Sequence, residues 1–203
     1  MPLIRRGATP PHPQLDGPSD PLADLGAPDP DLRRRAAREL GARPDSASVL
    51  GRALALEGEA DVRSAIVGAL VRIGGEDAVA ALLPHLGSDD AARRGAVLSA
   101  LQDLPETLAH LPGLLADPDP DIRVLAAEIA RAMPPTAAAE LLCAMILREP
   151  LPNPCAAAVD VLAEVGSPDC LPALHACEER FAAEPFLRFA IRTTIARLSA
   201  GGA

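Results

Sequence analysis

The feature that most constrains the fold of this chain is a motif that recurs about every thirty residues. Asp31-Leu32-Arg33 is one copy, and Asp61-Val62-Arg63 is the next. A fixed period of this size is typical of solenoids, whose small units pack only against their neighbours. With the arginine taken as the anchor, the copies stand 30, 31, 29, 32 and 33 residues apart, at Arg33, Arg63, Arg94, Arg123, Cys155 and Arg188.

Each anchor is followed by apolar residues at helical spacing. In the second copy they stand at +3, +4, +7 and +10, as Ile66, Val67, Leu70 and Ile73. This spacing predicts a helix with one buried face, which ends at Gly74. Another helix precedes each anchor, for example over residues 76–86, and an acidic turn joins the two. We call the first helix of each unit the A helix and the second the B helix.

The composition also favours helices. Hydrophobic residues make up 49% of the chain, yet Trp and Tyr are missing and Phe occurs three times. Sheet proteins are richer in aromatic and β-branched residues, whereas Ala, Leu and Arg favour helices. We therefore predict an all-α fold, an α-solenoid of about six antiparallel helix hairpins over residues 20–199. We also expect a disordered, proline-rich tail over residues 1–19 and a flexible C-terminus over residues 200–203.

Charge and hydropathy exclude several kinds of partner. The formal net charge is −9, whereas nucleic-acid binders neutralise phosphates with a basic surface, so no nucleic acid is expected. No apolar run approaches the length needed to cross a bilayer, so no membrane is expected either. The opening segment lacks the apolar stretch of a signal peptide. We therefore expect a cytoplasmic protein whose four cysteines are reduced.

The repeat unit has a family resemblance. The first copy, Asp31-Leu32-Arg33-Arg34-Arg35-Ala36-Ala37-Arg38-Glu39-Leu40-Gly41, resembles a HEAT repeat. Its short period is similar to that of the bacterial HEAT repeats also found in phycobilin lyase subunits. The resemblance implies a superhelical, protein-binding scaffold with the B helices on its concave side. The His-Glu pairs of the HEAT-like di-iron hydroxylases are missing, so no metal or cofactor is expected.

The outward positions of the B helices predict a binding groove. They lie near +1, +5 and +8 or +9 from each anchor, away from the apolar stripe. Their mixed charges suit a protein or peptide better than a polyanion, although a merely solvated face has the same pattern. The partner-binding residues expected there are Arg34, Arg38, Arg72, Glu128, Arg131 and Asp160.

The last repeat adds a second candidate region. It holds all three phenylalanines and several arginines, the residue types that dominate interface hot spots. Phe189, Arg192 and Arg197 therefore complete the expected partner-binding set. A terminal repeat also needs a cap, so Phe181 and Phe186 alternatively seal the core. The irregular, proline-rich segment over residues 150–155 is another place where a site is often grafted.

Three further patterns have structural interpretations. We interpret the anchor arginines as a ladder of ion pairs with turn carboxylates rather than as an anion site. The acidic turns are interpreted as helix caps. The cysteines lack the spacing of a metal site and are expected to be free thiols in the core. Cys143 and Cys177 stand at similar heights on successive A helices, so they are the pair expected to approach each other.

The sequence thus favours a non-catalytic adaptor, scaffold or assembly factor in a bacterial cytoplasm. It would bind another protein through the B-helix groove and the C-terminal repeat. An alternative is a chaperone or lyase-type factor that handles a chromophore or cofactor of a client protein, which predicts a coloured preparation. A DNA glycosylase of similar architecture would need a basic, aromatic-lined groove, which the sequence lacks. The identity of the partner and the oligomeric state stay open.

Overall fold

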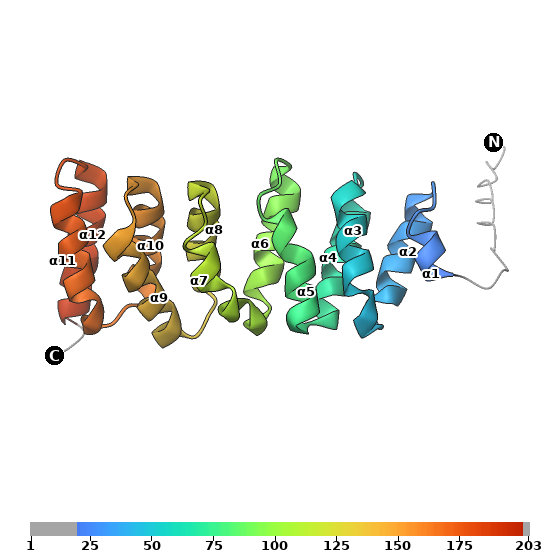
Figure 1. Cartoon of the computed structure of the whole chain (residues 1–203), viewed down its shortest axis with the longest axis horizontal. Helices are drawn as coiled ribbons and strands as arrows, with labels where there is room; N and C mark the ends of the chain where they lie inside the picture. The colour runs from blue at the N-terminus through green and yellow to red at the C-terminus, as the bar shows by residue number, and fades with distance from the viewer. Residues whose placement is uncertain (1–19, 201–203) are drawn as a thin grey trace, which may run out of the picture.

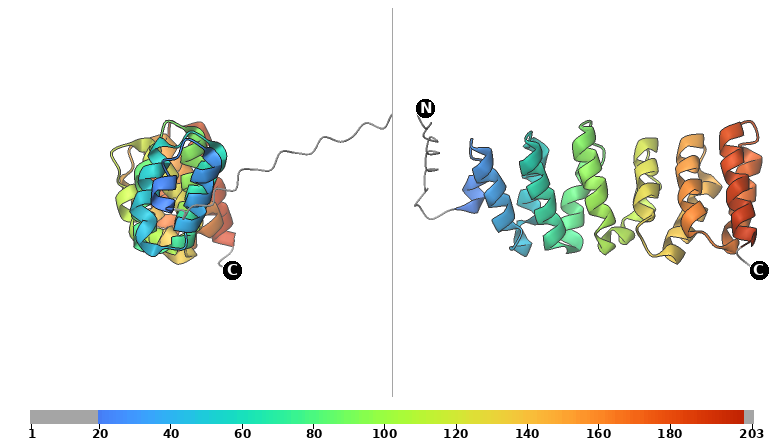
Figure 2. Two further views of the ribbon diagram at one scale, coloured as in Figure 1. Left: turned by 90° about the vertical axis from the view of Figure 1, so that its right-hand side faces the viewer. Right: turned by 180° about the vertical axis from the view of Figure 1, so that it is seen from behind.

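The computed structural model describes residues 20–200. The tail predicted over residues 1–19 and residues 201–203 lie outside the described residues. Six helix hairpins stand side by side in one row, as predicted, with the first hairpin at one end and the last at the other (Figure 1). Figure 2 shows the row from its end and from behind, and its helices form two layers. Within residues 20–200 the fold is all-α and holds no strand.

The first three hairpins occupy residues 20–102. The first pairs α1 (Pro21–Asp24) with α2 (Pro30–Leu40). The second pairs a short 3-10 turn and α3 (Ala47–Leu56) with α4 (Ala60–Ile73). The third pairs α5 (Gly75–Leu82) and the following 3-10 turn with α6 (Ala91–Gln102).

The last three hairpins occupy residues 105–200. In the fourth, a 3-10 turn (Pro105–Ala109) and α7 (Leu111–Leu114) pack against α8 (Pro120–Ala130). The fifth consists of α9 (Pro135–Arg148) and α10 (Pro152–Val165). The sixth consists of a 3-10 turn (Pro168–Cys170), α11 (Leu171–Arg180) and α12 (Pro185–Ala200). The irregular segment of the fifth repeat therefore ends in the first turn of α10, which begins at Pro152.

Most of the acidic turns cap helices, as predicted, whereas the side chain of Glu59, the N-cap of α4, makes no capping bond. Asp20, Asp29, Asp90 and Asp119 are each the N-cap of a helix and accept hydrogen bonds from backbone N–H groups of its first turn. Such caps satisfy donors that have no partner inside the helix. Three of these helices also begin with proline, whose missing N–H costs nothing there.

The core follows the predicted helical spacing. In α4, Ile66, Val67 and Leu70 are buried, and Ile73 is half-buried. Small residues let neighbouring hairpins approach closely. A Cβ atom added to Gly51 of α3 would lie 3.0 Å from the carbonyl oxygen of Ala81 on α5. These apolar faces form one continuous core through all six hairpins.

The predicted ladder of ion pairs forms at Arg33, Arg63 and Arg123. Among the described residues the other two anchor arginines, Arg94 and Arg188, make no ion pair and donate to the carbonyl oxygens of Ser88 and Ala182. Arg33 donates from Nε and Nη2 to the two carboxylate oxygens of Glu57, at 2.8 and 3.0 Å. Its Nη1 donates to the carbonyl oxygen of Ala27, in the turn of its own hairpin. Arg123 repeats this arrangement, with Nε and Nη2 on Glu149 at 2.6 and 2.9 Å and Nη1 on the carbonyl oxygen of Asp117. Each arginine thus links its own turn to the next hairpin.

The ladder varies between repeats. Arg63 reaches across to Asp90, the N-cap of α6, at 2.8 Å. In the fifth repeat Cys155 stands at the anchor, and its thiol donates to the carbonyl oxygen of Glu149 at 3.8 Å. Arg180 of the next hairpin donates to the same carbonyl at 2.6 Å. A guanidinium from a neighbouring repeat therefore binds the turn whose own anchor arginine is missing.

The cysteines are free thiols, and three of them are buried. The expected pairing of Cys143 with Cys177 is wrong. Cys143 interacts with Cys170, and Cys155 interacts with Cys177. The antiparallel course of α10 and α11 explains the second pair, because the first turns of α10 lie beside the last turns of α11. Burial and the neighbouring Cys170 raise the pKa of the Cys143 thiol.

The pair between Arg123 and Glu149 is nearly inaccessible, with side-chain exposures of 11% and 3%. Burial opposes ionisation of Glu149, but the hydrogen bonds from Arg123 and from the N–H of Leu151 outweigh it and hold the pKa of the carboxyl below its ordinary value. We expect Glu149→Gln to lower the free energy of unfolding by about 3 kcal/mol, because the guanidinium loses its counter-charge while it stays buried. Urea denaturation at pH 7 measures this loss.

Asp31→Asn is the matched control, since Asp31 makes an exposed ion pair with Arg34 on the same ladder edge. Its expected cost is below about 1 kcal/mol. Equal losses for the two variants would contradict a special contribution of the buried pair.

Candidate protein-binding surface

The residues expected to bind a partner fall into three groups on the B helices. The first group lies between α2 and α4, the second between α8 and α10, and the third on α12. Along the row the groups follow one another as a basic cleft, an acidic cluster and an aromatic end. In order, they contain Arg34, Arg38 and Arg72; Glu128, Arg131 and Asp160; and Phe189, Arg192 and Arg197.

The first group lines a cavity of about 460 Å³. We call this cavity the basic cleft. Gly68 of α4 lies in its wall, and a Cβ atom added there would meet nothing within 4 Å, so the cleft is open at this point. Its charge is basic overall, because three arginines face one carboxylate of the lining. The lining consists of Arg34, Arg38, Asp61, Ser64, Ala65, Gly68 and Arg72.

The arginines of the basic cleft keep unused donors. Arg72 donates one hydrogen bond, from Nη1 to the carbonyl oxygen of Arg38 at 3.3 Å. Arg34 pairs with the exposed Asp31 at 2.8 Å and reaches Asp61 at 4.0 Å. A guanidinium has five N–H donors. The cleft can therefore bind a further carboxylate or carbonyl group.

The second group is tied together internally. Arg131 bridges α8 and α10, because it pairs with Glu128 on its own helix and with Asp160 and Glu164 on the next B helix. The hydrogen bonds that Arg131 donates to Asp160 and then to Glu128 are the main reasons why the pKa of Arg131 is raised further above its ordinary value. Three carboxylates around one guanidinium leave an excess of negative charge. Arg131 is thus a bridge between repeats, and the carboxylates form an acidic cluster.

The third group projects from the last helix. The Phe189 side chain is 73% exposed, and Phe186 one turn earlier is 91% exposed. The alternative in which Phe186 seals the core is therefore wrong, because its position at the start of α12 points away from the hairpin. Phe181 is buried, as that alternative expected, and Arg180 lies over its ring at 5.6 Å. Arg192 is exposed and pairs with Glu178 of α11.

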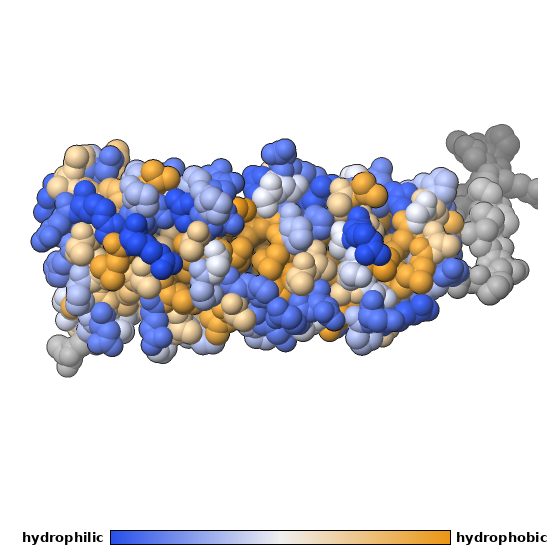
Figure 3. All heavy atoms as spheres, viewed as in Figure 1, coloured by the Kyte–Doolittle hydropathy of each residue, from blue (hydrophilic) through white to orange (hydrophobic). Residues whose placement is uncertain are grey.

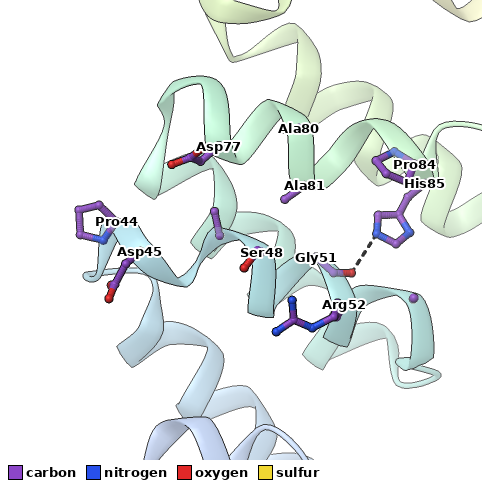
Figure 4. A pocket seen from close by; sticks show the side chains of 12 residues that line it. Pro44, Asp45, Ser48, Gly51, Arg52, Asp77, Ala80, Ala81, Pro84 and His85 are labelled. Atoms are coloured by element: carbon purple, nitrogen blue, oxygen red, sulfur yellow. Dashed lines mark hydrogen bonds between the residues drawn. The ribbon is translucent and has the colours of Figure 1, made fainter.

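Sequence reasoning missed a cavity between the A helices α3 and α5. It measures about 560 Å³ and has a largely apolar lining with a few polar side chains at its edge (Figure 4). Arg52, Asp45 and Asp77 supply the charges. The sequence feature that could have predicted this cavity is the pair of small residues Gly51 and Ala81, which leave little side-chain volume between the two helices. On the face seen in Figure 3, hydrophobic side chains lie among hydrophilic ones along the whole row.

His85 closes one side of this cavity. Its Nε2 lies 2.9 Å from the carbonyl oxygen of Gly51, so Nε2 carries the proton and donates the bond (Figure 4). Burial lowers the pKa of His85 below its ordinary value, and the nearby Arg93 acts in the same direction, while the bond to Gly51 opposes the shift.

The repeat unit and the packing of the hairpins agree with one family. Residues 19–102, which include the first three hairpins, match the family model of HEAT repeats. The chain contains HEAT repeats. HEAT repeats generally mediate protein–protein interactions, and the same hairpin unit continues through this protein to residue 200. The resemblance to the phycobilin-lyase type of repeat stays a prediction.

Two solved structures are similar to this protein, and both are crystal structures of engineered proteins. The first has 17% sequence identity and a TM-score of 0.43, with 89% of this chain and 96% of that chain covered. The second has 18% identity and a TM-score of 0.41, with 88% of this chain and 57% of that chain covered. No curated protein matches the sequence. Among the helices described, none has both the length and the apolar content needed to cross a bilayer.

The lowered pKa of His85 predicts a pH dependence of stability. The unfolded chain takes up a proton on this histidine near pH 6.5, whereas the folded chain resists it. The unfolded state therefore binds more protons as the pH falls below that value, and the folded state loses stability. We expect the free energy of unfolding to fall between pH 7.5 and pH 5.5 in the wild type, as measured by urea denaturation.

His85→Gln is the control, because the amide can still donate to Gly51 but does not titrate. The decline over this pH range is expected to be smaller in the variant. The window lies above the range where carboxylates titrate, so they contribute little to it. An identical decline in both proteins would refute the assignment to His85.

Proposed function

We propose that this protein is a scaffold or adaptor that binds another protein through its B-helix face and its C-terminal repeat. The observation that carries the proposal is the basic cleft between α2 and α4, whose arginines keep unused donors. The general role of HEAT repeats in protein–protein interaction supports it. On the sequence pattern alone, we place the protein in the cytoplasm of a bacterium.

The order of charges along the B helices indicates the kind of partner. The basic cleft favours an acidic segment, and the acidic cluster around Arg131 favours a basic one. A polyanion would be attracted by the first group and repelled by the second. A polypeptide with charges of both signs satisfies both groups. We therefore propose a protein or peptide ligand that lies along the row.

The test begins with affinity capture from the native lysate and identification of a partner present in near-stoichiometric amount. Binding of the purified partner is then measured by calorimetry for the wild type and for Arg38→Glu/Arg72→Glu. We expect at least tenfold weaker binding for the double variant, because reversed charge repels an acidic segment. Circular dichroism checks that the helices are kept.

Arg52→Glu is the matched control, since Arg52 lies on the A-helix layer beside the cavity of Figure 4. It is expected to bind like the wild type. Loss of binding in Arg52→Glu, with binding kept in the cleft variant, would move the site to the A-helix layer and contradict the proposal.

The aromatic end gives a separate prediction. Truncating Phe189, whose ring is largely exposed, is expected to weaken partner binding without loss of helical content. The same holds for Arg192→Glu, which reverses an exposed charge on α12. Binding affinity and far-UV circular dichroism are measured together. If both variants bind like the wild type, the C-terminal repeat is not part of the interface.

A further inference from the structure

The four cysteines meet in two pairs, and both pairs cross the boundary between the fifth and sixth repeats. Cys143 of α9 interacts with Cys170, which ends the 3-10 turn before α11. Cys155 of α10 interacts with Cys177 of α11. All four are free thiols. A bond within either pair would therefore join two neighbouring hairpins covalently.

The two pairs differ in their access to solvent. Cys155 and Cys177 are fully buried in the core. Cys143 and Cys170, in contrast, both line a cavity of about 380 Å³ on the A-helix layer. Cys143 is half-buried, and the exposed Asp169 also belongs to the lining, so the cavity opens to solvent. A small molecule can therefore reach the first pair of thiols but not the second.

The stacking of the repeats brings the accessible pair together. The A helices α9 and α11 follow one another along the row, and α9 contacts both α11 and the 3-10 turn Pro168–Cys170 (Figure 1). Ala139, one turn before Cys143 on α9, also lines the cavity and leaves room above the thiols. A hydrogen bond joins the two thiols. The pair is thus held by packed elements of two hairpins.

Two thiols in contact are suited to oxidation. A structural zinc ion takes four ligands, and among residues 20–200 no three His, Cys, Asp or Glu side chains are placed to share a metal ion. A disulfide needs only the two sulfur atoms. Burial and the neighbouring Cys170 raise the pKa of the Cys143 thiol. Because the thiolate is the reactive form, oxidation is slow at neutral pH, as suits a bond formed under sustained oxidation.

We propose that Cys143 and Cys170 are a reversible oxidation site, at which a hydroperoxide such as hydrogen peroxide enters the cavity and converts the two thiols into a disulfide between the fifth and sixth repeats. The proposal goes beyond the scaffold function and does not depend on it. The bond would tie the A helix of the fifth repeat to the start of the A helix of the sixth.

The reaction proceeds in two steps. One thiol loses its proton, its sulfur attacks the O–O bond of hydrogen peroxide, and a sulfenic acid and one water are formed. The sulfur of the second thiol then attacks the sulfenic sulfur, the S–S bond forms, and a second water leaves with the remaining proton. Two thiols and one hydrogen peroxide thus give one disulfide and two waters, and a dithiol reductant reverses the change.

The test compares the full chain before and after treatment with hydrogen peroxide. Remaining thiols are alkylated, the chain is digested, and linked peptides are identified by tandem mass spectrometry. We expect a link between Cys143 and Cys170 that disappears with dithiothreitol, while Cys155 and Cys177 are found alkylated, because peroxide does not reach them in the folded core.

Complementary variants isolate each pair. Cys155→Ala/Cys177→Ala keeps the cavity pair and is expected to lose two hydrogen atoms on oxidation, like the wild type. Cys143→Ala/Cys170→Ala keeps the buried pair and is expected to retain two free thiols. Cys170→Ala leaves Cys143 without a second thiol, so Cys143 is expected to gain oxygen as a sulfinic or sulfonic acid. Circular dichroism checks that each variant is folded.

The link is also expected to stabilise the stack. The oxidised wild type should unfold at a temperature about 5 °C higher than the reduced protein, because the bond restricts the unfolded chain. Thermal unfolding with and without dithiothreitol measures this shift. Cys143→Ala/Cys170→Ala is the matched control and is expected to show none.

Four outcomes would overturn the inference. One is a link between Cys155 and Cys177 that forms as fast as the link between Cys143 and Cys170. Another is oxygen added to Cys143 in the wild type with no link formed. The third is a link that joins two chains, seen as a dimer on a non-reducing gel. The fourth is an oxidised wild type that unfolds no later than the reduced protein, since the bond would then not join two native helices.

Discussion

The structure depends on one constraint, which is that no hairpin of this chain can cover its own apolar face. Leu70 of α4, Leu101 of α6 and Leu162 of α10 are fully buried, and they belong to one core that runs through successive hairpins. Stacking is therefore the only way to remove these faces from water, and each interface stabilises the two hairpins beside it. The stack also brings the turns together at one edge, which makes the ladder of arginines possible.

The ladder shows that the fold requires hydrogen-bond donors at the turns more than it requires an arginine at every anchor. At the fifth anchor Cys155 is too short to fill the place of a guanidinium, and Arg180 approaches the carbonyl of Glu149 from the next hairpin instead. Arg93 likewise donates to the carbonyl of Glu57. Two glutamates with nearly inaccessible side chains thus receive donors from both sides. A buried carboxylate without hydrogen-bond donors would destabilise the stack. At these two turns guanidinium groups supply the donors, although the arginines that carry them stand at different positions in the repeat.

The periodicity was sufficient to predict the six hairpins, the buried stripe and the linking arginines, because all three depend on spacing within a single repeat. The periodicity could not predict features that depend on the relative height of two helices. Cys177 faces Cys155 rather than Cys143, and Arg131 is enclosed by carboxylates of two helices instead of being free on a groove. The cavity between α3 and α5 depends on how closely Gly51 lets the two A helices approach. The expectation that Phe186 seals the core was wrong for a different reason. Hydrophobicity alone does not tell whether a residue at the end of the row has a neighbour to pack against.

The rigid spacing of the hairpins has a consequence for recognition. Packed helices lie about 8–10 Å apart, so the basic cleft between α2 and α4 and the acidic cluster between α8 and α10, three repeats further along, are separated by roughly 27 Å. A small ligand cannot contact both groups at once, whereas about eight residues of extended polypeptide span that distance. The core and the ladder use the inward positions and the turns of each repeat, which leaves the outward positions of the B helices free to differ. Under the proposed function, specificity would arise from the order of charges along the row, and a partner whose charges match one group but not the next would gain only part of the binding energy.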